Sequence, residues 1–155
     1  SRMMTELIEF YGVAADEKGI SLRLSGEAQT VGDALMIRRA VGNLLSNALR
    51  HTPLGAWVSV TLGMEEDWAI IDVCNAGETI PPSDLPRLFD RFFRADAARS
   101  ASEGQTGLGL SLVRSIIEAH RGEVLVTSEK GVTCFRLRLP ASSGDFADTD
   151  KHTMI

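Results

Sequence analysis

Cysteine is nearly absent from the sequence. The two cysteines, Cys74 and Cys134, lie far apart and have no histidine or further cysteine at the spacing of metal ligands, so a zinc site is not expected. Both lie in apolar, strand-like runs, which favours buried, reduced thiols in a cytosolic fold. A disulfide between them is an alternative that the sequence leaves open.

The chain also lacks long apolar runs and an excess of positive charge. No apolar run approaches the roughly 18 residues that a membrane-spanning helix requires, and residues 1–6 contain no apolar segment of a signal peptide. Sixteen Lys and Arg against 21 Asp and Glu give a net charge of −5, which argues against a general nucleic-acid or anionic-membrane binder. We therefore expect a soluble, monomeric chain without a nucleic-acid partner, and a local phosphate site is compatible with this charge.

What the chain does contain is typical of one soluble globular domain: 155 residues, 44% of them apolar and 24% charged. Apolar periodicity, glycines and prolines predict helices at 4–17, 34–50 and 107–120, a short helix ending at 93, and strands at 20–24, 56–63, 68–74, 123–128 and 132–139. This order favours an α/β two-layer sandwich, in which a mixed sheet is covered on one face by three helices.

Local signals set the expected ends of these elements. Asp33 is a suitable N-cap for the helix at 34–50, and Ser83 is a suitable cap for the short helix. Residues 94–106 are small and polar, which predicts a mobile surface loop. We expect residues 1–140 to form the domain and residues 141–155 to form a disordered C-terminal tail.

One face of the helix at 34–50 carries a polar row. At 100° per residue, Asn43, Asn47 and Arg50 lie within about 60° of one another around the helix axis. Their row is separate from the apolar stripe, which consists of Ile37, Val41, Leu44, Leu45 and Ala48. Amide oxygens can coordinate Mg²⁺, and a guanidinium can neutralise phosphate, so the row suits an oxygen-rich ligand. Taken alone, it is more readily explained as a solvated polar face.

Two glycine-containing segments add to this row. Asn75 and Gly77 follow a predicted strand, where an amide can read a ligand and a glycine permits close backbone approach, although a plain turn explains them as well. Residues 104–110 lead directly into a helix, whose N-terminus favours an anion. They do not follow a strand and contain no Gly-Lys-Ser/Thr, so neither a dinucleotide-binding fingerprint nor a P-loop is expected.

Together and in this order, the segments resemble the catalytic and ATP-binding domain of sensor histidine kinases. Residues 43–51 (NLLSNALRH) resemble the N box, and residues 75–80 (NAGETI) resemble the first glycine box. Residues 88–94 (LFDRFFR) resemble the F box, and residues 104–110 (GQTGLGL) resemble the second glycine box. The resemblance covers residues 4–140, nearly all of the predicted folded part.

The resemblance extends to one branch of the family. The run over 75–96 is similar to that of the heavy-metal sensors, which respond to copper, silver, cadmium or zinc. Two positions depart from the wider family. Asn75 stands where most members carry Asp, and His51 stands where many carry Tyr.

The resemblance implies a Bergerat fold with a flexible ATP lid over about 94–106. It implies that Asn43 and Asn47 serve Mg²⁺ and the phosphates, that Arg50 and Arg94 serve the phosphates, and that Asn75 reads adenine. It also places Phe89 beside the nucleotide, where we interpret Phe89 and Phe92 as packing at the base of the lid rather than as chemical groups. The remaining implied nucleotide-binding residues are His51, Gly77, Ile80, Gly104, Thr106, Gly107, Leu108, Gly109 and Leu110.

The function implied is transfer of the ATP γ-phosphoryl group to a histidine on a separate dimerisation domain, in a two-component system with a response regulator. No histidine in the chain is followed by the Glu or Asp of the acceptor motif, so the acceptor is expected on a separate domain. The resemblance also implies that the chain is the cytoplasmic catalytic domain of a bacterial inner-membrane sensor. An ATP hydrolase of the chaperone or mismatch-repair type is disfavoured, because such enzymes use Glu where this chain has Asn43, and an amide is no general base. A serine kinase of the anti-sigma-factor kind is a closer match, but its F-box region is not expected to match this fully. The sequence is also compatible with a non-enzymatic, nucleotide-occupied interaction module.

Overall fold

The computed structural model describes residues 2–93, 109–141 and 152–154. Within these residues each α-helix is followed by two or more strands, and one 3-10 turn, η1, precedes α4. The elements are α1 (Arg2–Glu17), β1 (Ser21–Gly26), β2 (Gln29–Val31), α2 (Ala34–His51), β3 (Trp57–Glu65), β4 (Trp68–Ala76), η1 (Leu85–Arg87), α4 (Gly109–Ala119), β5 (Glu123–Glu129), β6 (Val132–Pro140) and β7 (His152–Met154).

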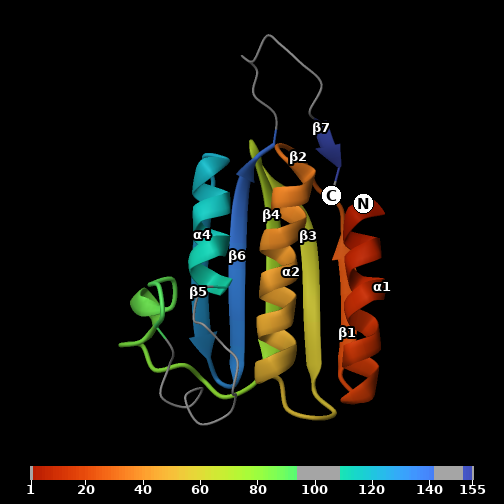
Figure 1. The fold of residues 1–155 in the computed structure, drawn as a ribbon, viewed down its shortest axis with the longest axis vertical. Coiled ribbons are helices and arrows are strands. Elements are labelled where there is room, and N and C mark those ends of the chain that lie inside the picture. The colour runs from red at the N-terminus through yellow and green to blue at the C-terminus, as the bar shows by residue number, and fades with distance from the viewer. Residues whose placement is uncertain (1, 94–108, 142–151, 155) are drawn as a thin grey trace.

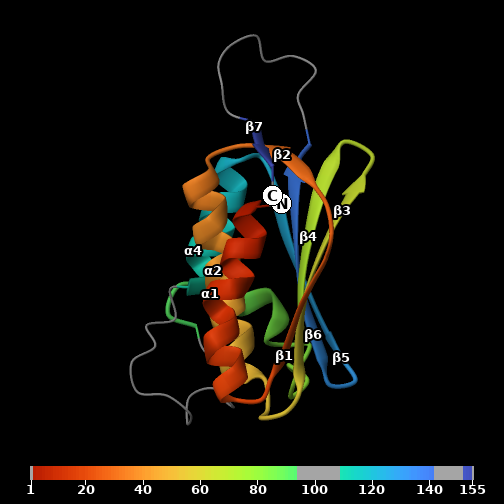
Figure 2. The same cartoon turned by 90° about the vertical axis from the view of Figure 1, so that its right-hand side faces the viewer.

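The main sheet has five strands in the order β1-β3-β4-β6-β5. β1 runs parallel to β3, and the other neighbouring strands are antiparallel, so the sheet is mixed. Figures 1 and 2 show α1, α2 and α4 side by side on one face of this sheet, while the described part of the chain leaves its other face uncovered. The predicted two-layer α/β sandwich is confirmed.

The core lies between the helices and the sheet. The apolar stripe predicted on α2 is buried from Ile37 to Ala48, where it meets inward-facing strand residues such as Val60 and Ile71. Burying a leucine or isoleucine side chain contributes about 1.5–3 kcal/mol. This stripe therefore fixes the rotation of α2 about its axis and determines where its polar row points.

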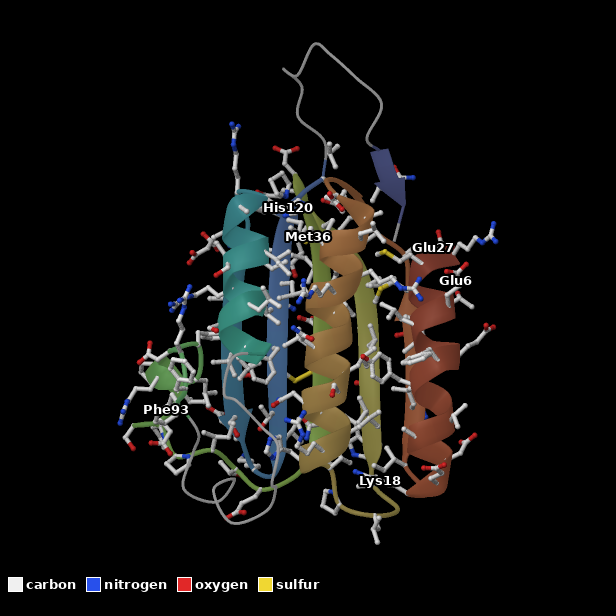
Figure 3. The ribbon with its side chains drawn as sticks, in the orientation of Figure 1. Glu6, Lys18, Glu27, Met36, Phe93 and His120 are labelled. Atoms are coloured by element: carbon white, nitrogen blue, oxygen red, sulfur yellow. A yellow bond between two sulfur atoms is a disulfide. The ribbon has the colours of Figure 1, made fainter. Side chains whose placement is uncertain are left out.

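Capping fixes the start of α2 as the sequence predicts. The side chain of Asp33 accepts a hydrogen bond from the Met36 amide at 3.1 Å, in the geometry of an N-cap. The Asp33 amide itself donates to Nε2 of His120, just beyond the end of α4, at 3.0 Å. Figure 3 shows His120 at the end of α4, close to the labelled Met36 of α2. The start of α2 is thus tied to the end of α4.

The predicted helix after Ser83 is wrong. The structure has only the turn Leu85–Arg87, which Asp84 precedes without a side-chain capping bond. Its backbone bonds span three residues, as from Arg87 to Asp84 and from Asp90 to Arg87. Phe92 has a left-handed backbone with a φ of 64°, and a right-handed helix that continues to residue 93 cannot contain it.

Two short strands were not expected. β2 pairs antiparallel with β7, whose residues 152–154 lie in the segment that the sequence analysis assigns to the tail. Thr30 of β2 is buried and donates its hydroxyl to the carbonyl of Pro140 at 2.8 Å. A strand of three residues is too short to show apolar alternation, and therefore periodicity did not reveal it.

The prediction of buried, reduced cysteines is also wrong. Cys74 on β4 and Cys134 on β6 are directly opposite each other and form a disulfide. Both are half-buried and lie on the sheet face away from the helices, because their strand neighbours Val73 and Phe135 point into the core. The apolar runs place the cysteines in strands, but alternation directs them outward.

Candidate functional site

The polar row predicted on α2 is present in the structure. Asn43 and Asn47 are half-exposed, Arg50 is exposed, and all three lie in the C-terminal half of the helix. A guanidinium nitrogen of Arg50 donates to the hydroxyl of Ser46 at 3.4 Å. Arg50 and His51 form the last turn of α2, where positive charge is favoured by the helix dipole.

The start of α4 faces this row. The amide nitrogen of Asn43 donates to the carbonyl oxygen of Gly109, the first residue of α4, at 3.4 Å. The first N–H groups of a helix have no partners within the helix and carry partial positive charge, so they favour an anion. Figure 1 shows the start of α4 beside the lower half of α2. Two predicted phosphate-binding features are therefore neighbours.

The end of β4 supplies a buried amide. Asn75 is 4% exposed and donates its side-chain N–H to the carbonyl of Ala76 at 3.1 Å. Its neighbours across the sheet are Val58 on β3 and Thr133 on β6. A buried amide has both a donor and an acceptor to satisfy, so its position restricts which hydrogen-bonding pattern a ligand can present.

Gly77 joins the end of β4 to the end of α2. A Cβ built on Gly77 would lie 2.9 Å from the carbonyl oxygen of His51, so the two backbones approach as closely as only glycine permits. The Gly77 amide donates to the carbonyl of Gly131 in the β5–β6 turn at 2.9 Å. The first glycine segment is consequently held against α2 on one side and against the β5–β6 hairpin on the other.

Sequence reasoning missed a hydroxyl pair that supports this loop. Ser128 and Thr133 are buried, and their hydroxyls are 2.8 Å apart. The Ser128 hydroxyl also accepts from the Ile80 amide at 2.8 Å, and the Thr79 hydroxyl accepts from the Gly131 amide at 2.8 Å. The signal was available, because Ser128 and Thr133 occupy the inward-facing positions of strands that otherwise bury apolar side chains.

The aromatic residues of the F-box segment divide into two groups. Phe89 is buried and packs edge-to-face on Phe135, with ring centroids 6.0 Å apart, as the packing interpretation requires. Phe92 is 70% exposed and has a positive φ of 64°, so the packing interpretation of Phe92 is wrong. The Arg87 guanidinium lies 4.4 Å from the ring centroid of Phe93. The outward position of Phe92 follows from its left-handed backbone.

The donor set of the site suits a hard cation together with phosphate. Among the described residues there is no group of three or more His, Cys, Asp or Glu that could hold a metal ion. The oxygen donors on α2 are the amides of Asn43 and Asn47, and Mg²⁺ commonly takes few protein oxygens while keeping waters and substrate phosphates. The residues therefore fit Mg²⁺ bound together with a nucleotide.

Other predicted site residues have mixed outcomes. Ile80 and Leu110 are half-buried and pack against the core beside the site, which gives each a structural role. Five predicted residues lie outside the described part of the chain: Arg94, Gly104, Thr106, Gly107 and Leu108. Within the described residues, no helix combines the length and the apolar character needed to cross a membrane.

Comparison with known proteins gives the family. Residues 32–143 match the family model "Histidine kinase-, DNA gyrase B-, and HSP90-like ATPase". The sensor histidine kinase CusS of Escherichia coli K12 is 44% identical over 137 residues, covering 88% of this chain and 28% of that protein. The sensor protein CzcS of Cupriavidus metallidurans is 40% identical over 143 residues, covering 92% of this chain and 30% of that protein. The chain thus spans less than a third of the length of these relatives.

Solved structures agree with the sequence comparison. The mycobacterial sensor histidine kinase MprB matches with a TM-score of 0.77 at 29% identity, covering 88% of this chain and 95% of that one. A nucleotide-free catalytic domain of the histidine kinase ThkA has the same fold, with a TM-score of 0.79 at 22% identity, covering 90% of this chain and 91% of that one. The chain therefore belongs to the histidine kinase-, DNA gyrase B- and HSP90-like ATPase family.

Proposed function

We propose that this domain binds Mg²⁺ and ATP at the C-terminal half of α2 and delivers the γ-phosphoryl group to a histidine on a separate dimerisation domain of the full-length kinase. The observation that carries the proposal is the convergence of three segments on α2. Asn43 contacts the start of α4, and the carbonyl of His51 meets Gly77 at the end of β4. A nucleotide lying along α2 would have its phosphates near α4 and its base near Asn75.

Each site residue receives a role in this proposal. Asn43 and Asn47 hold Mg²⁺ and phosphate oxygens through their amides, and Arg50 neutralises phosphate charge. Asn75 reads the base, and Gly77 lets the loop after β4 pack against the end of α2. His51, Ile80, Phe89, Gly109 and Leu110 line or support the site, while the roles of Arg94, Gly104, Thr106, Gly107 and Leu108 remain predictions from the sequence.

In this proposal the protein contributes mainly by positioning the nucleotide and the acceptor. In phosphoryl transfer the enzyme does little covalent chemistry. Orientation of the reacting groups and neutralisation of their charge therefore provide most of the catalysis. A bound Mg²⁺ would neutralise charge on the phosphate oxygens. The amides of Asn43 and Asn47 orient those oxygens, and the partial positive charge at the start of α4 supports them.

The histidines described in this chain do not suit the role of acceptor. Nε2 of His120 accepts from the Asp33 amide, and Nδ1 lies 2.7 Å from the Ile116 carbonyl, so both ring nitrogens are engaged. His120 also follows the 11-residue helix α4, roughly 16 Å from its start at 1.5 Å per residue. His51 is assigned to the nucleotide site itself in this proposal. We therefore expect the acceptor to come from another domain.

We place the domain in a larger sensor on the basis of its relatives. CusS is named a sensor histidine kinase, and one matching structure is ThkA in complex with the response regulator TrrA. We propose by analogy that this chain serves a two-component system with its own response regulator. The resemblance to heavy-metal sensors adds that the system responds to metal and that the domain lies on the cytoplasmic side of a bacterial inner membrane.

The test is phosphotransfer between separate domains. The chain is incubated with Mg²⁺ and γ-labelled ATP, alone and with the dimerisation domain of the same full-length kinase. We expect acid-labile phosphohistidine on the added domain only. Asn43→Ala and Asn47→Ala should each lower the rate at least tenfold, whereas Leu35→Ala, an exposed position at the start of α2, should leave it unchanged. Robust phosphohistidine on the isolated chain, or none on the added domain, contradicts the proposal.

A further inference from the structure

The two cysteines form a bonded pair on the open face of the sheet. Cys74 is the seventh residue of β4 and pairs in register with Cys134 of β6, and their Cα atoms are 4.1 Å apart. Residues that far apart on neighbouring antiparallel strands form a directly opposed pair whose side chains point to the same face. The pairing of β4 with β6 therefore brings these two sulfur atoms together.

The surroundings of the pair leave it accessible to small reagents. In the row across the sheet, Ser59 of β3 lies opposite Cys74 and Thr127 of β5 lies opposite Cys134. Both flanking side chains are small, and both cysteines are half-buried rather than buried. Figure 2 shows the three described helices on the far side of the sheet, away from this row. The disulfide is therefore less shielded than one inside the core.

The pair is also next to the site. Asn75 and Thr133, which are paired with each other across β4 and β6, are the immediate chain neighbours of Cys74 and Cys134 and point to the helix side. Thr133 contacts Ser128, which in turn accepts from the Ile80 amide of the first glycine segment. Making or breaking the disulfide therefore changes the link between β4 and β6 one residue away from Asn75, the proposed base reader, and from Thr133.

We propose that Cys74 and Cys134 are a reversible thiol–disulfide pair whose oxidation state sets the nucleotide affinity of the adjoining site, an inference that rests on the proposed function. In the disulfide form a covalent link fixes β4 against β6 beside Asn75. In the dithiol form only backbone hydrogen bonds hold β4 and β6 together at this point. Asn75 and Thr133 then have more conformational freedom, which they lose when nucleotide binds. Losing this conformational entropy on binding lowers the affinity, so we expect the dithiol form to bind ATP about fivefold more weakly than the disulfide form. A fivefold change in affinity is at the low end of the usual range of coupling between two sites.

The chemistry is ordinary thiol–disulfide exchange with a small-molecule disulfide such as oxidised glutathione. One cysteine thiolate attacks a sulfur of the reagent, forming a mixed disulfide and releasing one reagent thiolate. The second cysteine thiolate then attacks the protein sulfur of that mixed disulfide and releases the other reagent thiolate. In total two protein thiols are oxidised, one reagent disulfide is reduced to two thiols, and the two protons are taken up by the released thiolates. Reduction is the reverse sequence.

The first arm of the test measures reversibility without nucleotide. The chain is equilibrated in glutathione buffers of increasing oxidised-to-reduced ratio, and free thiols are counted by alkylation and mass spectrometry. We expect a reversible transition between no free thiols and two, with an unchanged far-ultraviolet circular dichroism spectrum. A disulfide that survives excess reduced glutathione, or a chain that unfolds when reduced, shows a purely structural bond and overturns the proposal.

The second arm measures coupling. Mg²⁺·ATP affinity of the disulfide and dithiol forms is compared by calorimetry, with the double variant Cys74→Ser, Cys134→Ser as control. We expect about fivefold weaker ATP binding to the dithiol form than to the disulfide form. The ATP affinity of the double variant should not depend on the redox buffer. Because coupling is reciprocal, adding ATP should also shift the disulfide-to-dithiol ratio by about fivefold. Equal affinities in both forms overturn the inference. Absence of ATP binding in either form would instead refute the proposed function, while the first arm still reports on the thiols.

Discussion

The carbonyl oxygen of His51, the last residue of α2, lies 2.9 Å from the position that a Cβ would occupy on Gly77. This contact joins the polar helix to the loop that follows the buried Asn75. The His51 oxygen belongs to the backbone, so it cannot move away from an added Cβ as the end of a flexible side chain can. The separation between α2 and the end of β4 is therefore set by the absence of a side chain at position 77.

Gly77→Ala should disturb the site more than an ordinary glycine substitution. We expect ATP affinity to fall at least tenfold and the free energy of unfolding to fall by about 1–3 kcal/mol, the usual cost of overpacking. Gly63→Ala is the matched control, because a Cβ at Gly63 meets no atom within 4 Å. Urea unfolding and calorimetry on the two variants provide the comparison. Equal effects of the two substitutions would contradict the close-approach account.

Asn75→Asp should change both stability and nucleotide preference. Asn75 is buried and donates to the Ala76 carbonyl, and a carboxylate cannot make that bond. We expect the unliganded variant to lose about 1–3 kcal/mol of unfolding free energy, the cost of an unsatisfied buried group. A carboxylate only accepts hydrogen bonds, so it favours the adenine amino group and repels the guanine oxygen. The preference for ATP over GTP should therefore sharpen by roughly tenfold, the equivalent of about 1.4 kcal/mol.

The readout for this variant is the ratio of ATP to GTP affinities rather than either affinity alone, since loss of stability lowers both. Equal ratios in the parent chain and the variant would remove Asn75 from the role of base reader. A variant that is as stable as the parent would show that the hydrogen bond from the Asn75 side chain to the Ala76 carbonyl is dispensable.

Gly32→Ala tests the contact between the end of α4 and the start of α2. A Cβ on Gly32 would lie 2.5 Å from the Cδ2 atom of His120 and 3.0 Å from a methyl group of Ile37. His120 is held by the Asp33 amide and lies against the Ile116 carbonyl, so its ring has little freedom to withdraw. We expect a loss of about 1–3 kcal/mol in unfolding free energy.

Gly12→Ala is the control for this substitution. A Cβ on Gly12, within α1, meets nothing within 4 Å, and alanine is the better helix former by about 1 kcal/mol. Urea unfolding should therefore show opposite signs for the two glycine-to-alanine changes. A destabilisation of equal size in both would contradict the contact between Gly32 and His120.

Acid stability should depend on the contact between α1 and α2. Hydrogen bonds from Arg38 and then Arg2 to the carboxylate of Glu6 lower the pKa of Glu6 from its usual 4.5. A carboxyl group whose pKa is lower in the folded state adds stability that is present above the unfolded value and is lost as pH falls through the folded value. The contribution is small and sensitive to salt, because the Glu6 and Arg38 side chains are both partly exposed.

Arg38→Met should therefore lower the urea midpoint slightly at pH 7 and flatten its fall between about pH 5 and pH 3, where the carboxylate is titrated. Arg39→Met, on the exposed side of the same helix, controls for loss of charge and should keep the parent's pH dependence. Identical acid profiles of the two variants would show that the pair with Glu6 contributes nothing.

Local rules recovered most of the architecture. The strands that form the sheet were visible as alternation, and the start of α2 was visible in Asp33, because both signals depend only on nearby residues. The β2–β7 pair was missed, since Thr30 and Thr153 are brought together by tertiary structure alone. The disulfide was missed for the same reason: Cys74 and Cys134 are seen to be opposite only when the pairing of β4 with β6 and its register are known.

The site was predicted as a set of motifs rather than as a geometry. The face of α2 that carries Asn43 and Asn47 follows from helical periodicity, but the contacts with Gly109 and Gly77 depend on how the layers pack. Ser128 and Thr133 were overlooked because a hydroxyl in a strand is common and its inward direction emerges only from the strand's alternation. Phe92 was misjudged because a left-handed backbone at a phenylalanine is rare and has no sequence signal.

The central claim, that the amide row of α2 binds nucleotide together with Mg²⁺, is tested most directly by calorimetric titration of ATP into the chain and into Asn47→Ala, each with and without Mg²⁺. The amide oxygen of Asn47 is the proposed hard ligand, and alanine removes it without adding charge. We predict that Mg²⁺ strengthens ATP binding to the parent chain and that Asn47→Ala loses this gain. Equal Mg²⁺-dependent ATP affinity in the two proteins would contradict the account.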